Sequence, residues 1–242
     1  MFEKIEVLDK EKYKNMKYTP VEPKEVGRHI GLIPLGFTEV LNINNFAPIL
    51  ISKGGKDVSE FVVFTGLSEG LNIFNNQEVY IPYFLRSYPF LTTTIKDEND
   101  KLRKVIGIDK TTKVAKNRKI PIFQDIDGEI TLSAESNEKI TIAQDLRLKR
   151  DVSISIINTL IEKDMLIKKD FKITYQNETK VIIDEYYIVN KEKLINELDD
   201  ETLLLWTKKG WISLIDAHLS SLSHFESIVN VKNIDRELID KK

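Results

Sequence analysis

Cysteine is absent from the 242-residue chain, which excludes disulfides, thiolate zinc sites, iron–sulfur clusters and a cysteine nucleophile. Glycine and proline, at 10 and 7 residues, are too few for a collagen-like or linker sequence. No apolar run approaches the roughly 18 residues of a membrane span. The first 18 residues are charged throughout and lack the apolar core of a signal peptide. We therefore expect a soluble cytoplasmic protein with no membrane span.

Charge is abundant but balanced, because 36 basic residues face 38 acidic ones and leave a net charge of −2. The chain therefore has no overall excess of positive charge that would attract nucleic acid or an anionic membrane, and nucleic acid is not an expected partner. One local basic run, residues 110–119, departs from this balance. We interpret that run as a solvated loop, and an acidic partner or nucleic acid is the alternative.

The first half of the chain, about residues 28–130, is expected to be rich in β-strands. Apolar, β-branched runs at 46–51 and 60–65 flank Gly54-Gly55, and further strands are expected at 79–81, 91–95 and 102–108. A short helical insertion is expected at 82–88, because Pro82 suits a first helical turn and Pro89 ends it. His29 is expected at the start of another strand.

The second half, about residues 131–230, is expected to be mainly helical with one β-hairpin. Residues 133–165 contain few helix breakers and read as a helix, in one or two pieces, with an apolar stripe through Val152, Ile156 and Leu160 beside Ile157 and Ile161. A hairpin at 171–189 precedes helices at 191–198, 201–209 and 211–229. With a charged tail at 231–242, these elements predict a single α+β domain over residues 1–242.

The usual signatures of catalysis are missing from the sequence. It contains no Gly-x-Ser-x-Gly elbow, no Walker motif, no complete dinucleotide fingerprint and no His-Glu-x-x-His pair. There are three histidines, and His218 and His224 lie about 240° apart on a continuous helix, so they cannot share a metal ion. We predict no catalytic residue, no metal site and no cofactor, and we lean against an enzyme.

Two residues nevertheless allow a functional interpretation. His218 continues an apolar stripe on the last helix, so it is either a buried neutral histidine tied to a carbonyl or hydroxyl, or a pocket histidine that titrates near neutral pH. Arg86 lies among aromatic residues in the segment 80–90, where it stacks or pairs with a carboxylate. Its interpretation is either a structural clamp or a site for an anion or a peptide carboxylate.

Several segments resemble, in order along about residues 5–229, the signature of the bacterial SapC family. The central match is Gly66-Leu67, Gly70, Asn72 and Phe74, followed by Tyr80-Ile-Pro, Phe84, Arg86 and Tyr88-Pro-Phe90. Matches flank it at 33–35, Glu39, 48–50, 123–129, 189–194, Leu203, Trp206 and 217–222. Two features depart from the family pattern: Tyr13 stands where a histidine is common, and residues 77–79 lack a common tryptophan.

The resemblance implies an accessory role at a bacterial surface-array locus rather than a known reaction. Members accompany genes for an S-layer protein and its type I secretion apparatus, and both are therefore expected partners. The peptide-transport permease of the same name is an unrelated membrane protein, and the absence of a long apolar run excludes it. We expect a protein or peptide binder.

A small-ligand protein or an enzyme is the alternative interpretation. Asn72, Tyr80, Arg86 and His218 are polar residues inside apolar motifs, where burial without a partner costs about 1–3 kcal/mol each. If all four line one pocket, a bound ligand would supply partners for their polar groups. With two neighbouring residues of the same motifs, the candidate ligand-binding residues are Asn72, Tyr80, Arg86, Tyr88, His218 and Ser221.

Overall fold

The protein is described from a computed structural model that covers residues 2, 4–53, 59–68, 71–76, 78–110, 114–115, 118–175 and 178–229. Strands and helices are both extensive, so the predicted α+β class is confirmed. The chain forms two compact units: residues 1–26 and 81–148 are unit 1, and residues 27–80 and 149–242 are unit 2. The expected single domain stays a prediction. Most of the run 110–119, the glycine turn at 54–55, Gly70 and the tail 231–242 lie outside the described residues.

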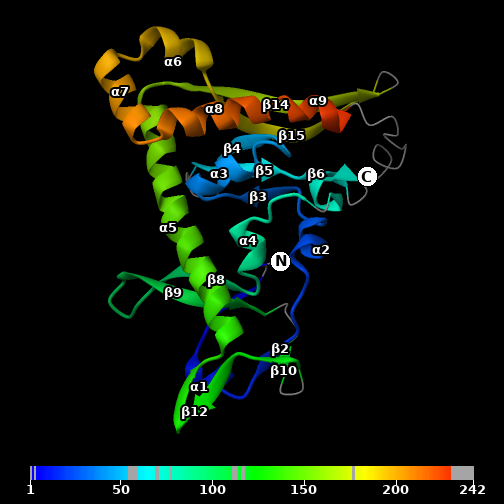
Figure 1. The fold of residues 1–242 in the computed structure, drawn as a ribbon, viewed down its shortest axis with the longest axis vertical. Coiled ribbons are helices and arrows are strands. Elements are labelled where there is room, and N and C mark those ends of the chain that lie inside the picture. Colours follow the sequence, from blue (N-terminus) through cyan, green and yellow to red (C-terminus); the bar gives the residue numbers. More distant parts are fainter. Residues whose placement is uncertain are drawn as a thin grey trace. The chain divides into compact units, whose positions relative to one another are not determined.

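Unit 1 is built from short sheets and the first half of a long helix (Figure 1). A three-stranded antiparallel sheet has the order β1-β9-β8, β2 pairs with β10 and β11, and β12 pairs with β13. The strands are β1 (Ile5–Val7), β2 (Lys17–Tyr18), β8 (Phe90–Lys96), β9 (Leu102–Asp109), β10 (Val114–Ala115), β11 (Ile120–Pro121), β12 (Phe123–Ile126) and β13 (Glu129–Leu132). The helices are α1 (Lys10–Tyr13), α2 (Pro23–Gly27, which ends in unit 2), α4 (Tyr83–Arg86) and α5 (Ala134–Glu162, which continues into unit 2).

The core of unit 1 forms where these short strands meet the start of α5. Tyr18 and Phe90 are fully buried with their ring centroids 5.6 Å apart, and Ile140 of α5 packs into the same cluster. Burial raises the pKa of the Tyr18 hydroxyl to about 12. The serine at the start of α5, Ser133, accepts a hydrogen bond from the Ser136 backbone N–H, which satisfies one free donor of the first helical turn.

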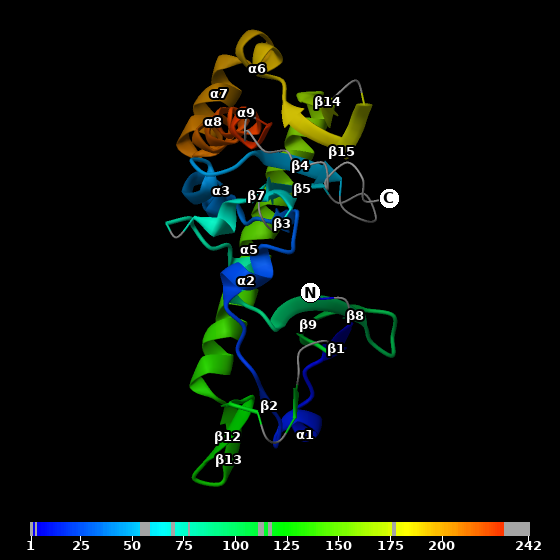
Figure 2. The same ribbon diagram turned by 90° about the vertical axis from the view of Figure 1, so that its right-hand side faces the viewer.

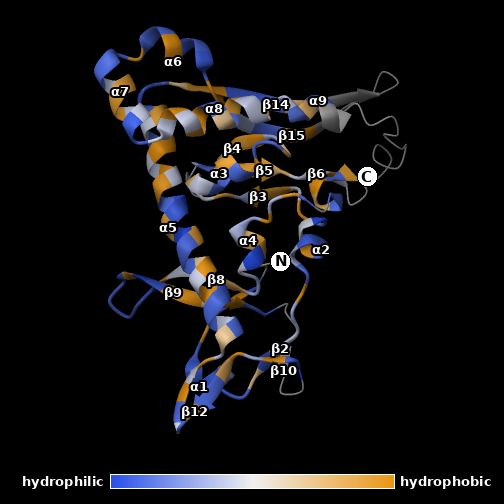
Figure 3. Ribbon diagram, in the orientation of Figure 1, coloured by the Kyte–Doolittle hydropathy of each residue, from blue (hydrophilic) through white to orange (hydrophobic). Residues whose placement is uncertain are grey.

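Unit 2 is organised around a five-stranded antiparallel sheet of order β14-β15-β4-β5-β3 (Figure 2). The elements of this unit are β3 (Leu32–Pro34), α3 (Phe37–Ile43), β4 (Ile49–Lys53), β5 (Ser59–Phe64), β6 (Gly66–Ser68), β7 (Leu71–Asn72), the 3₁₀ helix Ile73–Asn75, β14 (Leu166–Tyr175), β15 (Glu178–Val189), α6 (Lys191–Glu197), α7 (Asp200–Lys208), α8 (Trp211–Ser221) and α9 (His224–Val229). The central strands are mostly hydrophobic along their length (Figure 3). Residues on both faces of β4 and β5 are buried, as expected of a sheet covered on both sides.

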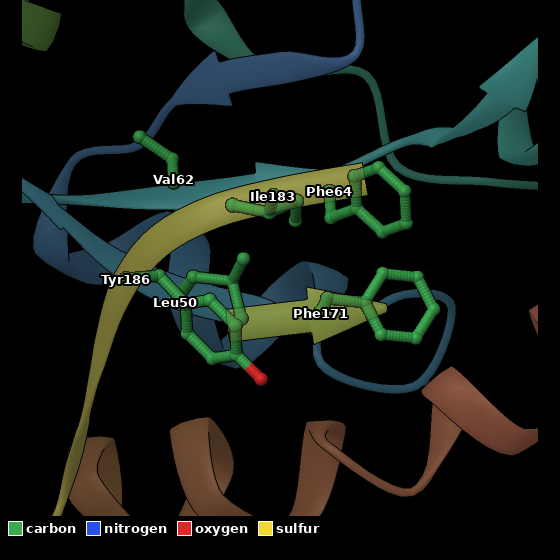
Figure 4. Packing of buried hydrophobic residues seen from close by; sticks show 6 residues of the cluster. All are labelled: Leu50, Val62, Phe64, Phe171, Ile183 and Tyr186. Atoms are coloured by element: carbon green, nitrogen blue, oxygen red, sulfur yellow. The ribbon is translucent and has the colours of Figure 1, made fainter. Parts of the chain in front are cut away.

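One face of this sheet carries a cluster of aromatic and aliphatic side chains. Figure 4 shows how they lie together from four strands, and Phe225 of α9 packs against them with its ring centroid 4.4 Å from that of Phe171. The cluster is Leu50, Val62, Phe64, Phe171, Ile183 and Tyr186. Removing these side chains from water stabilises the contact of α9 with the sheet by about 25 cal/mol for each Å² of apolar surface buried.

Local signals predicted several elements correctly. Strands β4 and β5, the hairpins β8–β9 and β14–β15 and the short helix α4 all occur where expected. Asn190 caps α6 through the Lys193 backbone N–H, Asp199 caps α7 through that of Thr202, and Gly210 has φ +74° after α7. Within the span 133–165, residues Ala134–Glu162 form one continuous helix, α5.

Four expectations of detail are wrong. Residues 79–81 form no strand, and His29 lies in a turn rather than at a strand start. The apolar stripe on α5 is narrower than expected. Ile156, Ile157 and Leu160 are buried, whereas Val152 and Ile161 at its two ends are exposed. The helix expected at 211–229 is divided at residues 222–223 into α8 and α9. Hydroxyl groups of Ser220 and Ser223 donate to carbonyls three residues back, which competes with the helical backbone pattern at this break.

Candidate functional site

His218 of α8 is fully buried and bridges two strands of the unit 2 sheet. Its Nδ1 lies 2.8 Å from the Ile49 carbonyl of β4, and its Nε2 accepts the Val189 backbone N–H of β15 at 3.2 Å. The ring is therefore the neutral tautomer that carries its proton on Nδ1. Burial lowers its pKa to about 4, and the Ile49 carbonyl opposes the shift. Of the two interpretations of His218, these contacts agree with the buried neutral histidine bonded to main-chain groups.

Ser221 lies one turn later on α8 and contacts the same strand residue. Its hydroxyl accepts the Ile49 backbone N–H at 2.9 Å and donates to the His218 carbonyl at 2.6 Å. Both backbone groups of Ile49 are thus satisfied by side chains of one helix. The two residues fasten α8 to the sheet, and the four side-chain hydrogen bonds all go to main-chain groups.

Asn72 and Tyr80, both in unit 2, also bond within their own neighbourhood. Asn72 caps the 3₁₀ helix through the Phe74 backbone N–H at 3.0 Å, and its amide lies 3.2 Å from the Thr65 hydroxyl. Tyr80 donates its hydroxyl to Glu39 at 3.2 Å, and the other oxygen of this buried carboxylate accepts the Gly36 backbone N–H. These contacts stabilise the start of α3 and the β6–β7 hairpin.

Arg86 and Tyr88 lie in unit 1, on and just after α4. The Arg86 guanidinium lies over the Tyr83 ring, 5.1 Å from its centroid, so the expected stacking is present. The Tyr88 ring packs edge-on against Phe2 at 5.4 Å, and Phe2 packs in the same way against Phe84 at 4.9 Å. This aromatic group holds α4 in place beside the hairpin β8–β9.

Lys139 of α5 is a residue that our sequence analysis did not select. Its half-buried ammonium group donates to the Arg86 carbonyl at 3.1 Å. Burial lowers the pKa of Lys139, and Arg86 lowers it further, whereas Glu138 and Glu22 raise it. Helical spacing could have indicated this position, since Lys139 precedes the buried residues Ala143 and Leu146 by four and seven residues on one face.

The candidate residues therefore divide between the two units. Arg86 and Tyr88 belong to unit 1, and the larger group, Asn72, Tyr80, His218 and Ser221, belongs to unit 2. Whether they serve one ligand stays a prediction. Among the described residues, no group of three or more histidines and carboxylates is placed to hold a metal ion. None of the described helices combines the length and the apolar character needed to cross a bilayer.

The second feature missed by sequence reasoning is a set of exposed apolar side chains on α6 and α7, Ile195, Leu203, Leu204 and Leu205, which we call the leucine face. Leu203, Leu204 and Leu205 are 41%, 55% and 47% exposed, although they are consecutive on α7, and Ile195 of α6 is 67% exposed. Figure 3 shows hydrophobic residues on both helices. Trp206, the next residue on α7, is buried with its ring centroid 5.5 Å from that of Trp211. The run Leu-Leu-Leu-Trp could have signalled more apolar surface than one helix face can bury.

Comparison with known proteins gives one family. The sequence model of the SapC family matches residues 8–228, nearly the whole chain. No curated protein and no solved structure matches the chain.

Proposed function

The chain belongs to the SapC family, and from that premise we propose that it is a protein-binding accessory of bacterial S-layer production or export. In this proposal it acts in the cytoplasm, on the S-layer protein or on a component of the type I secretion apparatus. The observation that carries the binding role is the leucine face. Three consecutive exposed leucines on one short helix are unusual for a surface with no partner, because apolar surface on water is unfavourable.

The character of the leucine face favours a transient partner over a second copy of the chain. A stable dimer buries about 800 Å² on each partner, and four half-exposed aliphatic side chains offer much less. Acidic residues Asp200 and Glu201 stand at the start of α7, and Lys208 and Lys209 at its end. This mixed polar rim suits an amphipathic segment of another protein, held weakly enough to be released to an exporter.

The test compares capture by the native protein and by two matched leucine variants. The tagged chain is expressed in its own S-layer-producing bacterium, and captured proteins are identified by mass spectrometry. We expect the S-layer protein or an exporter component to be recovered with the wild-type chain. Leu204→Asp replaces the middle one of the three exposed leucines by a charged residue and should reduce this recovery at least about tenfold.

Leu102→Asp is the matched control, because Leu102 lies on β9 of unit 1 and is 73% exposed. It introduces the same charge at a leucine that is even more exposed than Leu204, and it should leave recovery unchanged. Recovery of neither partner with the wild-type chain would overturn the S-layer role. Equal recovery by wild type and Leu204→Asp would overturn the leucine face as the binding surface.

The small-ligand alternative is supported by one observation. Of its four residues, the three in unit 2, Asn72, Tyr80 and His218, direct their side-chain polar atoms to protein groups. The Arg86 guanidinium forms no hydrogen bond or ion pair with any other described residue, so its donors remain available. An anion site at Arg86 would give this alternative a basis that does not depend on the leucine face.

A further inference from the structure

The side chain of Arg86 is held in place without using its hydrogen-bond donors. The guanidinium lies over the Tyr83 ring, and the backbone N–H of Arg86 donates to the carbonyl of Pro82, the residue before α4. A guanidinium has five N–H donors, and none of those of Arg86 meets an acceptor among the described residues. A cation in this state is ready to receive a planar anion edge-on.

A second cation accompanies it within the same unit. The Lys139 ammonium donates to the Arg86 carbonyl at 3.1 Å. Burial is the main cause that lowers the pKa of Lys139, and the positive charge of Arg86 adds to the lowering. Glu138 and Glu22 also act on Lys139 through space, yet neither forms an ion pair with it. Lys139 therefore has donors left for a ligand that binds at Arg86.

We propose that Arg86 and Lys139 form a binding site for a carboxylate, with the Tyr83 ring flanking the group that carries it. The guanidinium would donate two parallel hydrogen bonds to the two carboxylate oxygens, and the Lys139 ammonium would add a third contact. The carboxylate belongs either to a free small acid or to the C-terminus of a peptide. This site does not rest on the proposed S-layer role, and it lies on α4 and α5 rather than on the leucine face.

Charge decides between a carboxylate and a phosphate. Arg86, Glu22 and Glu138 lie within electrostatic reach of Lys139, so the two cations Arg86 and Lys139 are balanced by two carboxylates before a ligand arrives. A monoanion meets less repulsion from the two glutamates than a dianionic phosphate does. The planar guanidinium edge also matches the two oxygens of a carboxylate.

Aromatic contacts hold α4, the helix that carries Arg86, against the rest of unit 1. Phe2 packs edge-on against Phe84 and Tyr88, and its backbone N–H donates to the buried carboxylate of Asp109. These contacts join the short helix to β9 of the same unit. Little conformational freedom remains to be lost when a ligand binds, which favours affinity.

The test follows the Nε–Hε signal of Arg86 by NMR in the full-length chain during titration with four probes. These are N-acetyl-phenylalanine, its amide, acetate and inorganic phosphate. We expect N-acetyl-phenylalanine to shift the signal in a saturable way and the amide to leave it unmoved. Weaker binding of acetate assigns the site to a peptide C-terminus, and equal binding assigns it to free small acids.

Variants separate binding from folding. Arg86→Gln should weaken the binding of N-acetyl-phenylalanine, followed through the Tyr83 ring signals, at least about tenfold, and Lys139→Gln several-fold. Arg86→Lys keeps the charge, and it should also bind more weakly because the planar fork is lost. Arg103→Gln on β9, which removes an exposed arginine, is the control and should bind as the wild type does.

Three results would overturn the proposal. These are no saturable shift with either carboxylate probe, equal binding of the acid and its amide, or tighter binding of phosphate than of either carboxylate. Circular dichroism of each variant establishes that it is folded. If Arg86→Gln does not fold, Arg86→Lys and Lys139→Gln carry the test.

Discussion

His218 and Ile49 form the contact that joins α8 to the sheet of unit 2, with Nδ1 2.8 Å from the carbonyl oxygen. The pairing of Tyr187 with Ile51 places Val189 opposite Ile49, two residues further along each antiparallel strand. These two residues do not pair directly, and the imidazole accepts from one and donates to the other. A side chain from a helix thus takes the place of a strand-to-strand hydrogen bond.

Replacement of His218 by leucine should be strongly destabilising. The variant leaves the Ile49 carbonyl and the Val189 N–H unpaired in the core, at about 1–3 kcal/mol each, so we expect a loss of roughly 3 kcal/mol or more. Urea unfolding monitored by circular dichroism measures it. His224→Leu is the matched control, because His224 is half-buried and its ring makes one hydrogen bond within the described part of the chain, to the Asn44 carbonyl. Equal losses in the two variants would contradict the bridging role.

Two adjacent serines of α8 offer a second comparison. Ser221→Ala leaves the buried Ile49 N–H without its acceptor and should lower the free energy of unfolding by about 1–3 kcal/mol. Ser220→Ala removes an exposed hydroxyl that donates to the Ala217 carbonyl of its own helix, and its effect should stay within about 0.5 kcal/mol. The same denaturation experiment ranks the two, and a larger loss for Ser220→Ala would refute this role of Ser221.

The stability of the protein should depend on pH through His218. Its pKa is about 4 in the folded chain against 6.5 for an unperturbed histidine, so the unfolded chain binds a proton first as the pH falls. The contribution of His218 is complete above pH 6.5 and is lost as the pH falls from 6.5 to about 4, a total of roughly 3 kcal/mol. The ring nitrogens face main-chain groups of β4 and β15, and the Phe61 ring lies 5.9 Å away.

The measurement compares the wild type with His218→Gln at several pH values. Carboxylates such as Asp199, whose pKa is lowered by the Thr202 N–H, titrate in both proteins and cancel in the difference. We expect the wild type to lose stability relative to the variant between pH 6.5 and 4. A difference that stays constant over this range would show that His218 keeps an ordinary pKa in the fold.

Elements set by near neighbours in the chain were predictable from sequence. Asn190 and Asp199 act on backbone groups three residues away, and the glycine at 210 needs only its own backbone freedom. The burial of His218 followed from helical periodicity, since the residue continues an apolar stripe. These signals require no knowledge of the rest of the fold.

Contacts between distant segments were not predictable. His218 meets Ile49 across 169 positions, and Lys139 meets Arg86 across 53. Periodicity identifies the buried face of a helix, but it does not say which backbone groups that face contacts or which of its apolar residues stay exposed. For the same reason the exposed leucines of α7 look like core residues in the sequence.

An ion pair between Arg150 and Glu60 connects α5 to the sheet of unit 2. Arg150 donates from Nε to Glu60 of β5 at 2.8 Å, and its terminal nitrogen contacts the same oxygen. Both side chains are largely buried, so the pair should be worth more than a surface ion pair, about 1–2 kcal/mol in a double-mutant cycle. Arg150→Met and Glu60→Gln, singly and together, give that coupling from urea unfolding. Additive losses would show that the pair contributes nothing.

Two glycines with positive φ allow the stability cost of a steric clash to be measured apart from the cost of backbone strain. Gly66 has φ +146°, and a Cβ there would lie 1.8 Å from the Leu71 carbonyl oxygen, inside the β6–β7 hairpin. Gly128 has φ +85° in the turn between β12 and β13, and nothing lies within 4 Å of its Cβ position. Gly128→Ala should therefore cost about 1 kcal/mol from backbone strain alone. Gly66→Ala must also move backbone, and it should cost at least about 3 kcal/mol. Thermal and urea unfolding of both variants measure the difference, and a Gly66→Ala protein no less stable than Gly128→Ala would rule out the close approach at the hairpin.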